Sequence, residues 1–415
     1  MSLIKENHIL LSSDEKNILL EKKGIHFKIN VKEGYEYRFS GEINYSEFEK
    51  DNAALITFTF DGFELDMNNC QEYGLKYSNS VGAFSYLDTK YNTNTFDVTI
   101  KIPKGVNSIN VTLMPWYNNK EIHIAKMIFF QAIAPGKKRI FESCKQMVFS
   151  DITALKIIYD EPVLYRYVGE QFPFEFLAHF KTDSNKLVIL GTAAIKKEIV
   201  LPAFQRHTQI AAIPESCMIV HDPTYYVNRE ILVGWYQGDI SFPVIPTIIE
   251  LIDQFLYRMS LPNTNVLFYG GSAGGFFSLL MVAHFRDSVA FVTNPQTNLL
   301  KFNEKMVQIL LHYAYNDITI EEANKKYIEK MSIIELYRTL NFFPKVWYRQ
   351  NRLDFFHYKN HMLPFIEYYV RDTNDLSAHE NLIFELYSHE KGHNAVAELN
   401  DIIDEIRKAF LYFQA

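Results

Sequence analysis

From about residue 150 to its end, the chain alternates short apolar runs with longer segments of helical periodicity. The apolar runs expected to be strands lie at 186–192, 216–223, 265–270, 289–295, 345–351 and 382–388. The helical patterns lie at 246–259, 275–285 and 395–413. Because a helix that links two strands makes a βαβ unit, this alternation predicts an α/β fold with a mainly parallel sheet covered by helices. Residues 300–340 are also helical in pattern, and we expect them to form a cap-like insertion between late strands.

The first third of the chain follows a different pattern, with alternating apolar and polar residues and turn signals between the runs. Such runs lie at 35–43, 54–63, 95–102 and 108–116. They predict an antiparallel β-sandwich domain over residues 1–135. We expect a linker at 136–150, which follows the turn signal at Pro135, and an α/β domain over 151–415. A chain of 415 residues is too long for one ordinary core, in agreement with two domains.

Composition excludes several classes of function. The formal net charge is −7 and no basic stripe is present, which argues against a nucleic-acid-binding protein. No window approaches the roughly 20 apolar residues of a membrane span, and the opening residues 1–17 are broken by charges, unlike a secretory signal. The 3 cysteines are widely scattered and offer neither a metal site nor a disulfide framework. We therefore expect a cytoplasmic protein.

The motif Gly-Gly-Ser-Ala-Gly at residues 270–274 lies between a buried strand and an apolar helix. A serine on such a turn is held in a strained conformation that exposes its hydroxyl group at the helix N-terminus. Ser272 is therefore the candidate nucleophile. The alternatives are a tightly packed glycine-rich connection or a phosphate-binding loop, but the Lys-Ser/Thr pair of a P-loop is missing.

In hydrolases with this turn, the acid and then the histidine follow the serine along the chain, each after a late strand. His393 follows a glycine after the last expected strand and is the candidate base, with His389 as its main competitor. Asp354 follows the strand at 345–351 and is the candidate acid. The later alternatives, Asp372 and Asp375, are separated from that strand by a helical segment.

Two backbone N–H groups are expected to form an oxyanion hole, one from Ala273 and one from the loop after an early strand. Thr192 is the preferred residue in that loop, ahead of Ala193.

Four residues are candidates for contact with the substrate because they lie near these positions in the sequence: Gly191, Arg206, His207 and His357. His357 and His361 are four residues apart and could share a helix face, but further metal ligands are not evident, so no metal site is predicted.

With Ser272, Asp354 and His393 placed, the C-terminal two-thirds of the chain resembles the α/β-hydrolase superfamily of serine esterases and acyltransferases. Within it, several fragments resemble bacterial capsular-polysaccharide O-acetyltransferases and acetyltransferase-like components of accessory-secretion glycosylation systems. These fragments are FQRH (204–207), HDPTYY (221–226), GWYQG (234–238), FYGGSAGG (268–275) and QNRLDFFHYKNH (350–361). The strand pattern of residues 1–135 is similar to that of a carbohydrate-binding β-sandwich. The resemblance implies acyl transfer to or from a sugar hydroxyl, by an O-acetyl esterase or a glycan O-acetyltransferase.

The implied partners are a carbohydrate or a small acyl ester as substrate, with a second copy of the chain as a further candidate. No cofactor is expected, although an acyl-CoA could serve as the donor substrate. Two other interpretations stay open at this stage: a non-catalytic component of a glycan assembly complex, and a peptidase.

Overall fold

The structure is a computed structural model that describes residues 3–4, 7–11, 17–45, 54–87, 89–90, 94–116, 122–136, 138–371 and 380–414. The chain forms two compact units. The first holds Met1–Lys156 and Val163–Pro173, and the second holds Ile157–Pro162 and Phe174–Ala415. Asp372 and Asp375, the alternative acids, lie outside the described residues.

Two antiparallel sheets make up most of the first unit. The first sheet has the order β1(Leu3–Ile4)-β2(His8–Leu10)-β12(Ile122–Ile133)-β5(Glu36–Tyr45)-β10(Thr95–Lys101)-β9(Thr89–Lys90), and β3(Asn17–Leu19) also pairs with β12. The second has the order β4(Ile25–Asn30)-β11(Ser108–Pro115)-β6(Ala54–Phe60)-β8(Gly82–Tyr86)-β7(Lys76–Ser78). Their inner faces share one hydrophobic core. For example, the ring centroids of Phe39 on β5 and Phe58 on β6 lie 5.4 Å apart. Stacking of the two apolar faces makes this unit a β-sandwich.

The segment expected to be a linker, residues 136–150, is instead largely ordered structure of the first unit. It contains α1(Ile140–Ser143) and β13(Lys145–Phe149), and β13 pairs in parallel with β14(Val163–Val168). Two side-chain contacts attach β13 to the sandwich: Ser40 donates to the Gln146 side chain, and Thr95 donates to the Val148 carbonyl. The turn signal at Pro135 therefore marks a bend within the unit, and the short apolar run after it is a strand.

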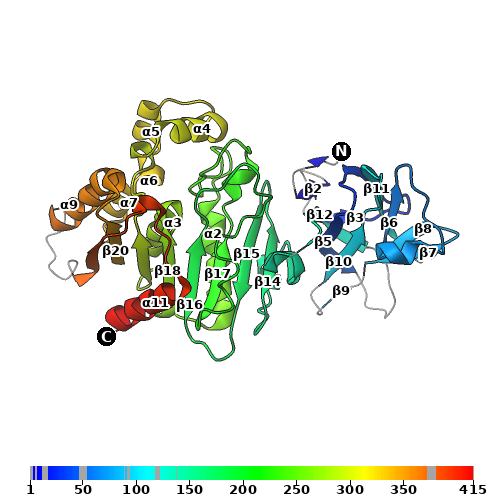
Figure 1. The fold of residues 1–415 in the computed structure, drawn as a ribbon, viewed down its shortest axis with the longest axis horizontal. Helices are drawn as coiled ribbons and strands as arrows, with labels where there is room; N and C mark the ends of the chain where they lie inside the picture. The colour runs from blue at the N-terminus through cyan, green and yellow to red at the C-terminus, as the bar shows by residue number, and fades with distance from the viewer. Residues whose placement is uncertain are drawn as a thin grey trace. The chain divides into compact units, whose positions relative to one another are not determined.

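The second unit contains a mainly parallel sheet with the order β15(Pro173–His179)-β17(Ser216–Val220)-β16(Leu187–Gly191)-β18(Val266–Gly271)-β19(Val289–Thr293)-β20(Lys345–Asn351)-β21(Leu382–Tyr387). The pair β15–β17 is antiparallel, and the other pairs are parallel. Figure 1 shows the labelled strands of this sheet side by side in that order. Each parallel strand coincides with an apolar run of the sequence. The strands β16 to β19 are almost entirely buried, as expected when helices cover both faces of a sheet, whereas β21 at the end of the order is mostly half-buried.

Helices cover both faces of this sheet. Successive side chains of a strand point to opposite faces. Phe268 of β18 packs against Phe277 of α3(Ser272–His284), whereas Tyr269 donates its hydroxyl to Glu405 of α11(Leu399–Gln414). The helices α3 and α11 therefore lie on opposite faces of β18. A further helix, α2(Ile245–Met259), packs through Phe255 against β15.

Between β19 and β20 the chain is helical, as expected for residues 300–340. The helices are α4(Glu304–Ala314), α5(Ile320–Lys326), α6(Ile328–Met331) and α7(Ile333–Leu340). After β20 come α8(Phe355–His357), the π-helical turn η6(Tyr358–Met362) and α9(Leu363–Arg371). In the part of the chain that the structure describes, no helix has the length and apolar character needed to cross a bilayer.

Candidate active site

Ser272 lies on a tight turn between β18 and α3. Its backbone φ is 55°, in the left-handed region that costs a non-glycine residue about 1–3 kcal/mol. The turn is tight because backbone atoms crowd its glycines. A Cβ at Gly270 would lie 2.3 Å from the Gly274 carbonyl oxygen, and a Cβ at Gly274 would lie 2.8 Å from the Gly191 carbonyl oxygen. The G-x-S-x-G pattern therefore has a steric reason here.

Gly270→Ala is expected to destabilise this turn strongly. Its methyl group would collide with main-chain atoms, which cannot move aside as a flexible side chain does, so we expect a loss of about 3 kcal/mol in unfolding free energy. Chemical denaturation measures this loss. Gly271→Ala is the matched control, because the nearest atom to its Cβ lies at 3.1 Å. Equal stability of the two variants would show that the turn can relax around a side chain at position 270.

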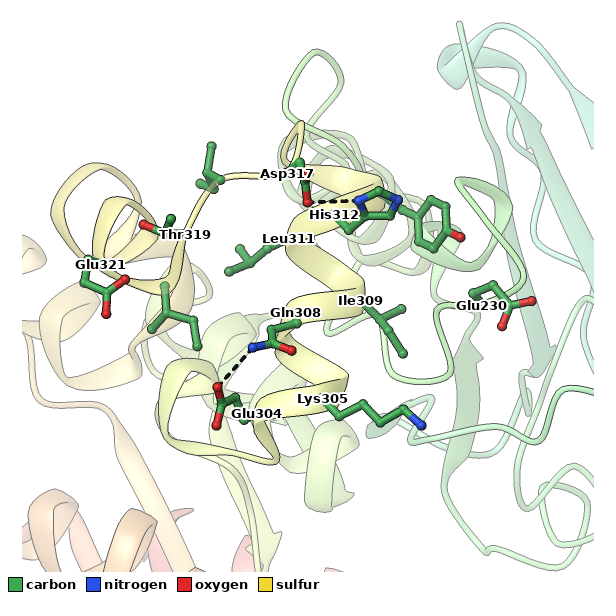
Figure 2. A pocket seen from close by; sticks show the side chains of 13 residues that line it. Glu230, Glu304, Lys305, Gln308, Ile309, Leu311, His312, Asp317, Thr319 and Glu321 are labelled. Carbon is green, nitrogen blue, oxygen red and sulfur yellow. Dashed lines mark hydrogen bonds and ion pairs between the residues drawn. The ribbon is translucent and has the colours of Figure 1, made fainter.

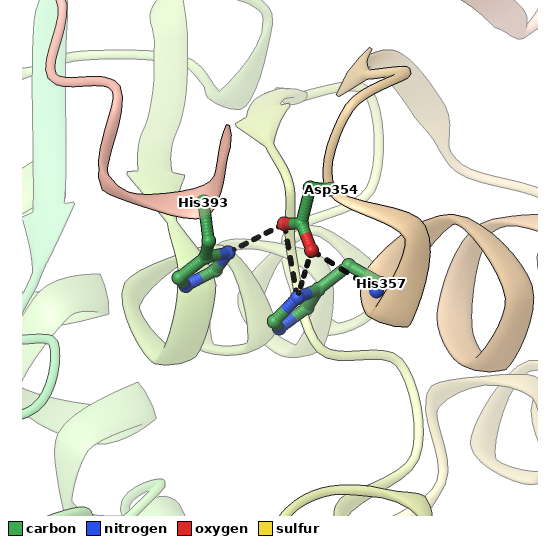
Figure 3. Close-up of side chains that lie close together, drawn as sticks. All are labelled: Asp354, His357 and His393. Atoms are coloured by element: carbon green, nitrogen blue, oxygen red, sulfur yellow. Dashed lines mark hydrogen bonds and ion pairs between the residues drawn. The ribbon is translucent and has the colours of Figure 1, made fainter. Parts of the chain in front are cut away.

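Ser272, His393 and Asp354 form a continuous hydrogen-bonded chain. The Ser272 Oγ lies 3.0 Å from the His393 Nε2. The His393 Nδ1 lies 2.7 Å from the Asp354 Oδ2, and Figure 3 shows this second contact. Each residue follows its own parallel strand: Ser272 follows β18, Asp354 follows β20, and His393 lies in η7(Gly392–Asn394) after β21. The structure therefore brings together the three residues that the sequence analysis selected, at the same edge of the sheet.

His389, the competing base, lies on the same loop but has other partners. It is exposed, and its Nδ1 accepts a hydrogen bond from the Lys391 amide. Buried Asn351 at the end of β20 holds this loop, since its side chain donates to the carbonyl oxygens of His389 and Gly392. Asn351 thus holds the turn that contains His393, and no sequence motif pointed to this role.

Asp354 accepts hydrogen bonds from two imidazole rings. Besides His393, the His357 Nδ1 lies 3.0 Å from the Asp354 Oδ1 (Figure 3). Burial by itself would raise the pKa of the Asp354 carboxyl, but the hydrogen bonds from both histidines outweigh it and hold that pKa well below its ordinary value. Asp354 is therefore ionised at neutral pH.

His357 was expected to contact the substrate, and the structure contradicts this. The ring is 4% exposed and stacks on His393, with centroids 4.0 Å apart and an interplanar angle of 9°. Its Nε2 lies 3.0 Å from the Gln296 Nε2. His361 is also buried, and its Nδ1 accepts from the Thr297 amide. The four-residue spacing of the two histidines thus places two buried rings that pack close to each other.

Asp354, His357 and His393 are also the cluster that could hold a metal ion among the described residues, because their ligand atoms lie within 4.8 Å of one another. These atoms are the ones that the two imidazole–carboxylate hydrogen bonds use. An ion here would replace both hydrogen bonds, so metal binding and base catalysis by His393 exclude each other.

The expected oxyanion donor Thr192 is engaged elsewhere. Its backbone N–H donates to the Tyr236 hydroxyl at 2.5 Å, and the residue is 1% exposed. Ala193, the alternative, lines the cavity beside Ser272, and its N–H donates to the Gln205 Oε1 at 3.0 Å. Ala273 lies in the first turn of α3, where backbone N–H groups lack an intrahelical partner. Of the two candidates in the loop after β16, Ala193 is at the cavity and Thr192 is not.

A cavity of about 400 Å³ opens beside Ser272. Its lining includes His393, Gly191 and Arg206, but not His207, His357 or Thr192. Among the described lining residues, Arg206 carries the only fixed positive charge, and none is an aspartate or a glutamate. Its guanidinium group donates to two neutral acceptors, the Gln209 side chain and the Ala397 carbonyl. No residue of the insertion at 300–340, all of which the structure describes, lines this cavity.

A second cavity of about 670 Å³ lies on that insertion, along α4 and the segment before α5 (Figure 2). Four of its polar side chains pair with one another: His312 with Asp317, and Gln308 with Glu304. It includes none of the residues around Ser272.

Comparison with known proteins identifies no family from sequence. No family model matches the chain, and no curated protein sequence matches it. Among solved structures, the capsule O-acetyltransferase of Neisseria meningitidis serogroup A is 16% identical, with a TM-score of 0.44 over 60% of this chain and 92% of that chain. The glycosylation-associated protein complex Gap123 from Streptococcus agalactiae is 11% identical, with a TM-score of 0.46 over 98% of this chain and 73% of that chain. The fluorophosphonate-binding serine hydrolase F of Staphylococcus aureus is 12% identical, with a TM-score of 0.41 over 61% of this chain and 98% of that chain.

Proposed function

We propose that this chain is a serine enzyme that transfers an acyl group from an ester or thioester, with Ser272 as nucleophile, His393 as base and Asp354 as acid. The observation that carries the proposal is the hydrogen-bonded chain from the Ser272 Oγ through His393 to Asp354. The strained backbone of Ser272 and the order of the three residues along the chain fit an α/β-hydrolase site.

The geometry supports a two-step reaction. His393 Nε2 takes the proton of Ser272 while the Oγ attacks the carbonyl carbon, and Asp354 stabilises the imidazolium that forms. The N–H groups of Ala273 and Ala193 hold the negative oxygen of the tetrahedral intermediate. Since Gln205 accepts from the Ala193 N–H in this structure, the substrate oxygen has to take the place of the Gln205 side chain.

The second step releases the acyl group from Ser272. The first step ends when the alcohol or thiol leaving group takes the proton from His393 and departs. His393 then takes a proton from either water or a sugar hydroxyl, which attacks the acyl carbon, and the Ser272 Oγ leaves with the proton that His393 returns to it. We propose a carbohydrate ester as the substrate class, on the resemblance of the fragments around Arg206, Ser272 and Asp354. Water as acceptor makes an O-acetyl esterase, and a glycan hydroxyl makes an O-acetyltransferase with an acyl-CoA as donor.

Turnover of acetyl-CoA and of acetylated sugars, with and without an acceptor glycan, tests this function. We expect acetyl release from at least one of these donors. Release from acetyl-CoA that is fast only with the glycan identifies a transferase, whereas a glycan-independent rate identifies an esterase. Cleavage of peptide libraries without any cleavage of acetyl esters would contradict the proposal in favour of a peptidase.

Arg206→Gln is expected to reduce activity selectively on anionic esters. The guanidinium is the only fixed positive charge that the described residues bring to the cavity, so it is the group placed to bind a phosphate or carboxylate of the substrate. A hydrogen bond between charged partners is worth about 1.5–3 kcal/mol, so we expect kcat/KM to fall about tenfold or more for acetyl-CoA. Neutral p-nitrophenyl acetate should be turned over as by the wild type.

The control for Arg206→Gln is Lys408→Gln, which removes one positive charge from the exposed side of α11. It should leave both substrates unaffected. If Arg206→Gln lowers kcat/KM equally for the anionic and the neutral ester, the side chain has a structural role through Gln209 and Ala397 instead.

A further inference from the structure

A second set of side chains joins Ser272 to Asp354 behind the serine. The Gln296 Nε2 donates to the Ser272 Oγ at 2.9 Å, and lies 3.0 Å from the His357 Nε2. The Trp235 indole N–H donates to the Gln296 Oε1 at 3.1 Å, and His357 reaches Asp354. The Gln296 backbone N–H also donates to the Ser272 carbonyl oxygen at 3.3 Å. Trp235, Gln296 and His357 are all buried.

The donor and acceptor of each hydrogen bond in this set can be assigned by starting from Trp235 at one end and Asp354 at the other. An indole N–H can only donate, and an ionised carboxylate can only accept. Trp235 therefore fixes the amide oxygen of Gln296 on its own side, which leaves the two N–H bonds of the amide for Ser272 and His357. Since the His357 Nε2 then has to accept, its proton lies on Nδ1 and is donated to Asp354. Every group in the set is satisfied in this one arrangement.

We infer that Gln296 and His357 are positioning residues that close Ser272, His393 and Asp354 into a hydrogen-bonded ring of five side chains. The inference rests on the proposed function, because it assigns a role in the reaction of Ser272. A serine hydroxyl has one hydrogen and two lone pairs. Gln296 occupies one lone pair, so the hydrogen is directed to His393 and the other lone pair is left for the substrate carbonyl.

The same amide acts again when the acyl group leaves. The bond between the carbonyl carbon and the Ser272 Oγ then breaks, and the electron pair of that bond returns to the oxygen. The Gln296 N–H donates to this oxygen as it gains negative charge, while His393 returns the proton to it. Gln296 therefore contributes to both acylation and deacylation.

His357 holds the carboxylate in place without competing for the proton of the serine. The two stacked imidazoles share one carboxylate, and two positive rings at 4.0 Å would repel each other. Burial lowers the pKa of His357; the hydrogen bond to Asp354 opposes this shift and nearby His393 adds to it. His357 is therefore kept neutral while His393 carries the proton.

Gln296→Met tests the inference, because methionine has a similar length and no donor. We expect kcat for p-nitrophenyl acetate to fall about 10²-fold with KM nearly unchanged. Pre-steady-state bursts should show slower acylation and slower deacylation. Trp235→Phe keeps a ring but releases the amide from its fixed orientation, so we expect a smaller loss, about threefold to tenfold. It decides the question if Gln296→Met does not fold.

Gln350→Met is the matched control. Gln350 is a fully buried glutamine of β20 whose amide donates to the Asn351 carbonyl and contacts neither Ser272 nor His357. It should lose stability but keep kcat within about twofold. A kcat loss in Gln296→Met that is no larger than in Gln350→Met would overturn the inference.

His357→Phe tests the role of His357 through the pH profile of kcat/KM, which a residue that only packs would not change. Phenylalanine keeps the stack on His393 but removes the donor to Asp354. The full negative charge then acts on His393, so we expect the ascending limb of the pH profile of kcat/KM to move to higher pH, with a lower plateau. An unmoved limb with an unchanged plateau would contradict the role of His357.

Labelling with a fluorophosphonate separates failure of this inference from failure of the proposed function. If the folded wild type does not label, the proposed function fails. If the wild type labels and Gln296→Met and Trp235→Phe label at the same rate as the wild type, only the inference fails.

Discussion

Ser272→Ala is expected to lower kcat for p-nitrophenyl acetate by about 10⁴–10⁶-fold and to abolish labelling by a fluorophosphonate probe. The hydroxyl that this change removes is the only nucleophile placed between His393 and the cavity among the described residues. Alanine fills less space than serine and keeps the left-handed backbone of the turn, so the thermal unfolding temperature should change little. Rates and labelling of the two proteins, measured at equal concentration, give the comparison.

His393→Ala should cause a loss of the same order, because Ser272 then has no group to take its proton. His389→Ala is the matched control on the same loop, since the His389 side chain is exposed and contacts neither Ser272 nor Asp354. It should label and turn over like the wild type. A folded wild type that neither labels nor hydrolyses any ester would favour the alternative function, a non-catalytic component of a glycan assembly complex.

Much of the second unit could be predicted from the sequence, because its signals are local. The apolar runs that alternate with helical patterns are the strands of the parallel sheet. The small residues around Ser272 are required by contacts below 3 Å within a single strand–turn–helix segment. His393 and Asp354 could be selected because parallel strands end at the same edge of a sheet. Their order along the chain selected the two segments, and the glycine before His393 favoured it over His389.

The site predictions that differ from the structure depend on the orientation of individual peptide groups and side chains, which no local sequence pattern encodes. Thr192 and Ala193 are neighbours in one loop, and only the orientation of each peptide group decides which N–H donates to Tyr236 and which lies at the cavity. Whether the His357 ring points into the cavity or away from it depends on the orientation of its side chain, and the structure buries it away from the cavity. Gln296 lies in a loop after β19, and its contacts with Ser272 and His357 join segments 24 and 61 residues apart. The sequence alone does not show such pairings.

The boundary between the two units was missed for a similar reason. The chain does turn at Pro135. The segment after it was expected to be a linker, but it contains β13, which pairs with β14 in the first unit. Pairing partners of a five-residue strand are decided by tertiary packing, because a short strand has too few residues for its sequence to specify them.

Asp354→Asn is expected to lower kcat about 10⁴-fold while the fold is kept, an effect known for the corresponding change in a Ser-His-Asp protease. In this chain both oxygens of the Asp354 carboxylate are needed, because each accepts a hydrogen bond from a different imidazole. An asparagine has one oxygen and one NH₂ group, so one of the two rings has to face a donor. If that ring is His393, its proton moves to Nε2, and it can no longer accept the proton of Ser272.

If the asparagine NH₂ faces His357 instead, the proton of His357 moves to Nε2 and meets the amide hydrogens of Gln296. The donor to the Ser272 Oγ is then displaced, so neither orientation of the asparagine restores the ring. The matched control is Asp222→Asn, which alters a fully buried aspartate that accepts from the Thr224 and Tyr236 amides and lies outside this ring. We expect that control to change the unfolding temperature but to keep kcat within a few-fold. A kcat for Asp354→Asn within tenfold of the wild type would show that Asp354 only holds the loop after β20, and that His393 works as a base without it.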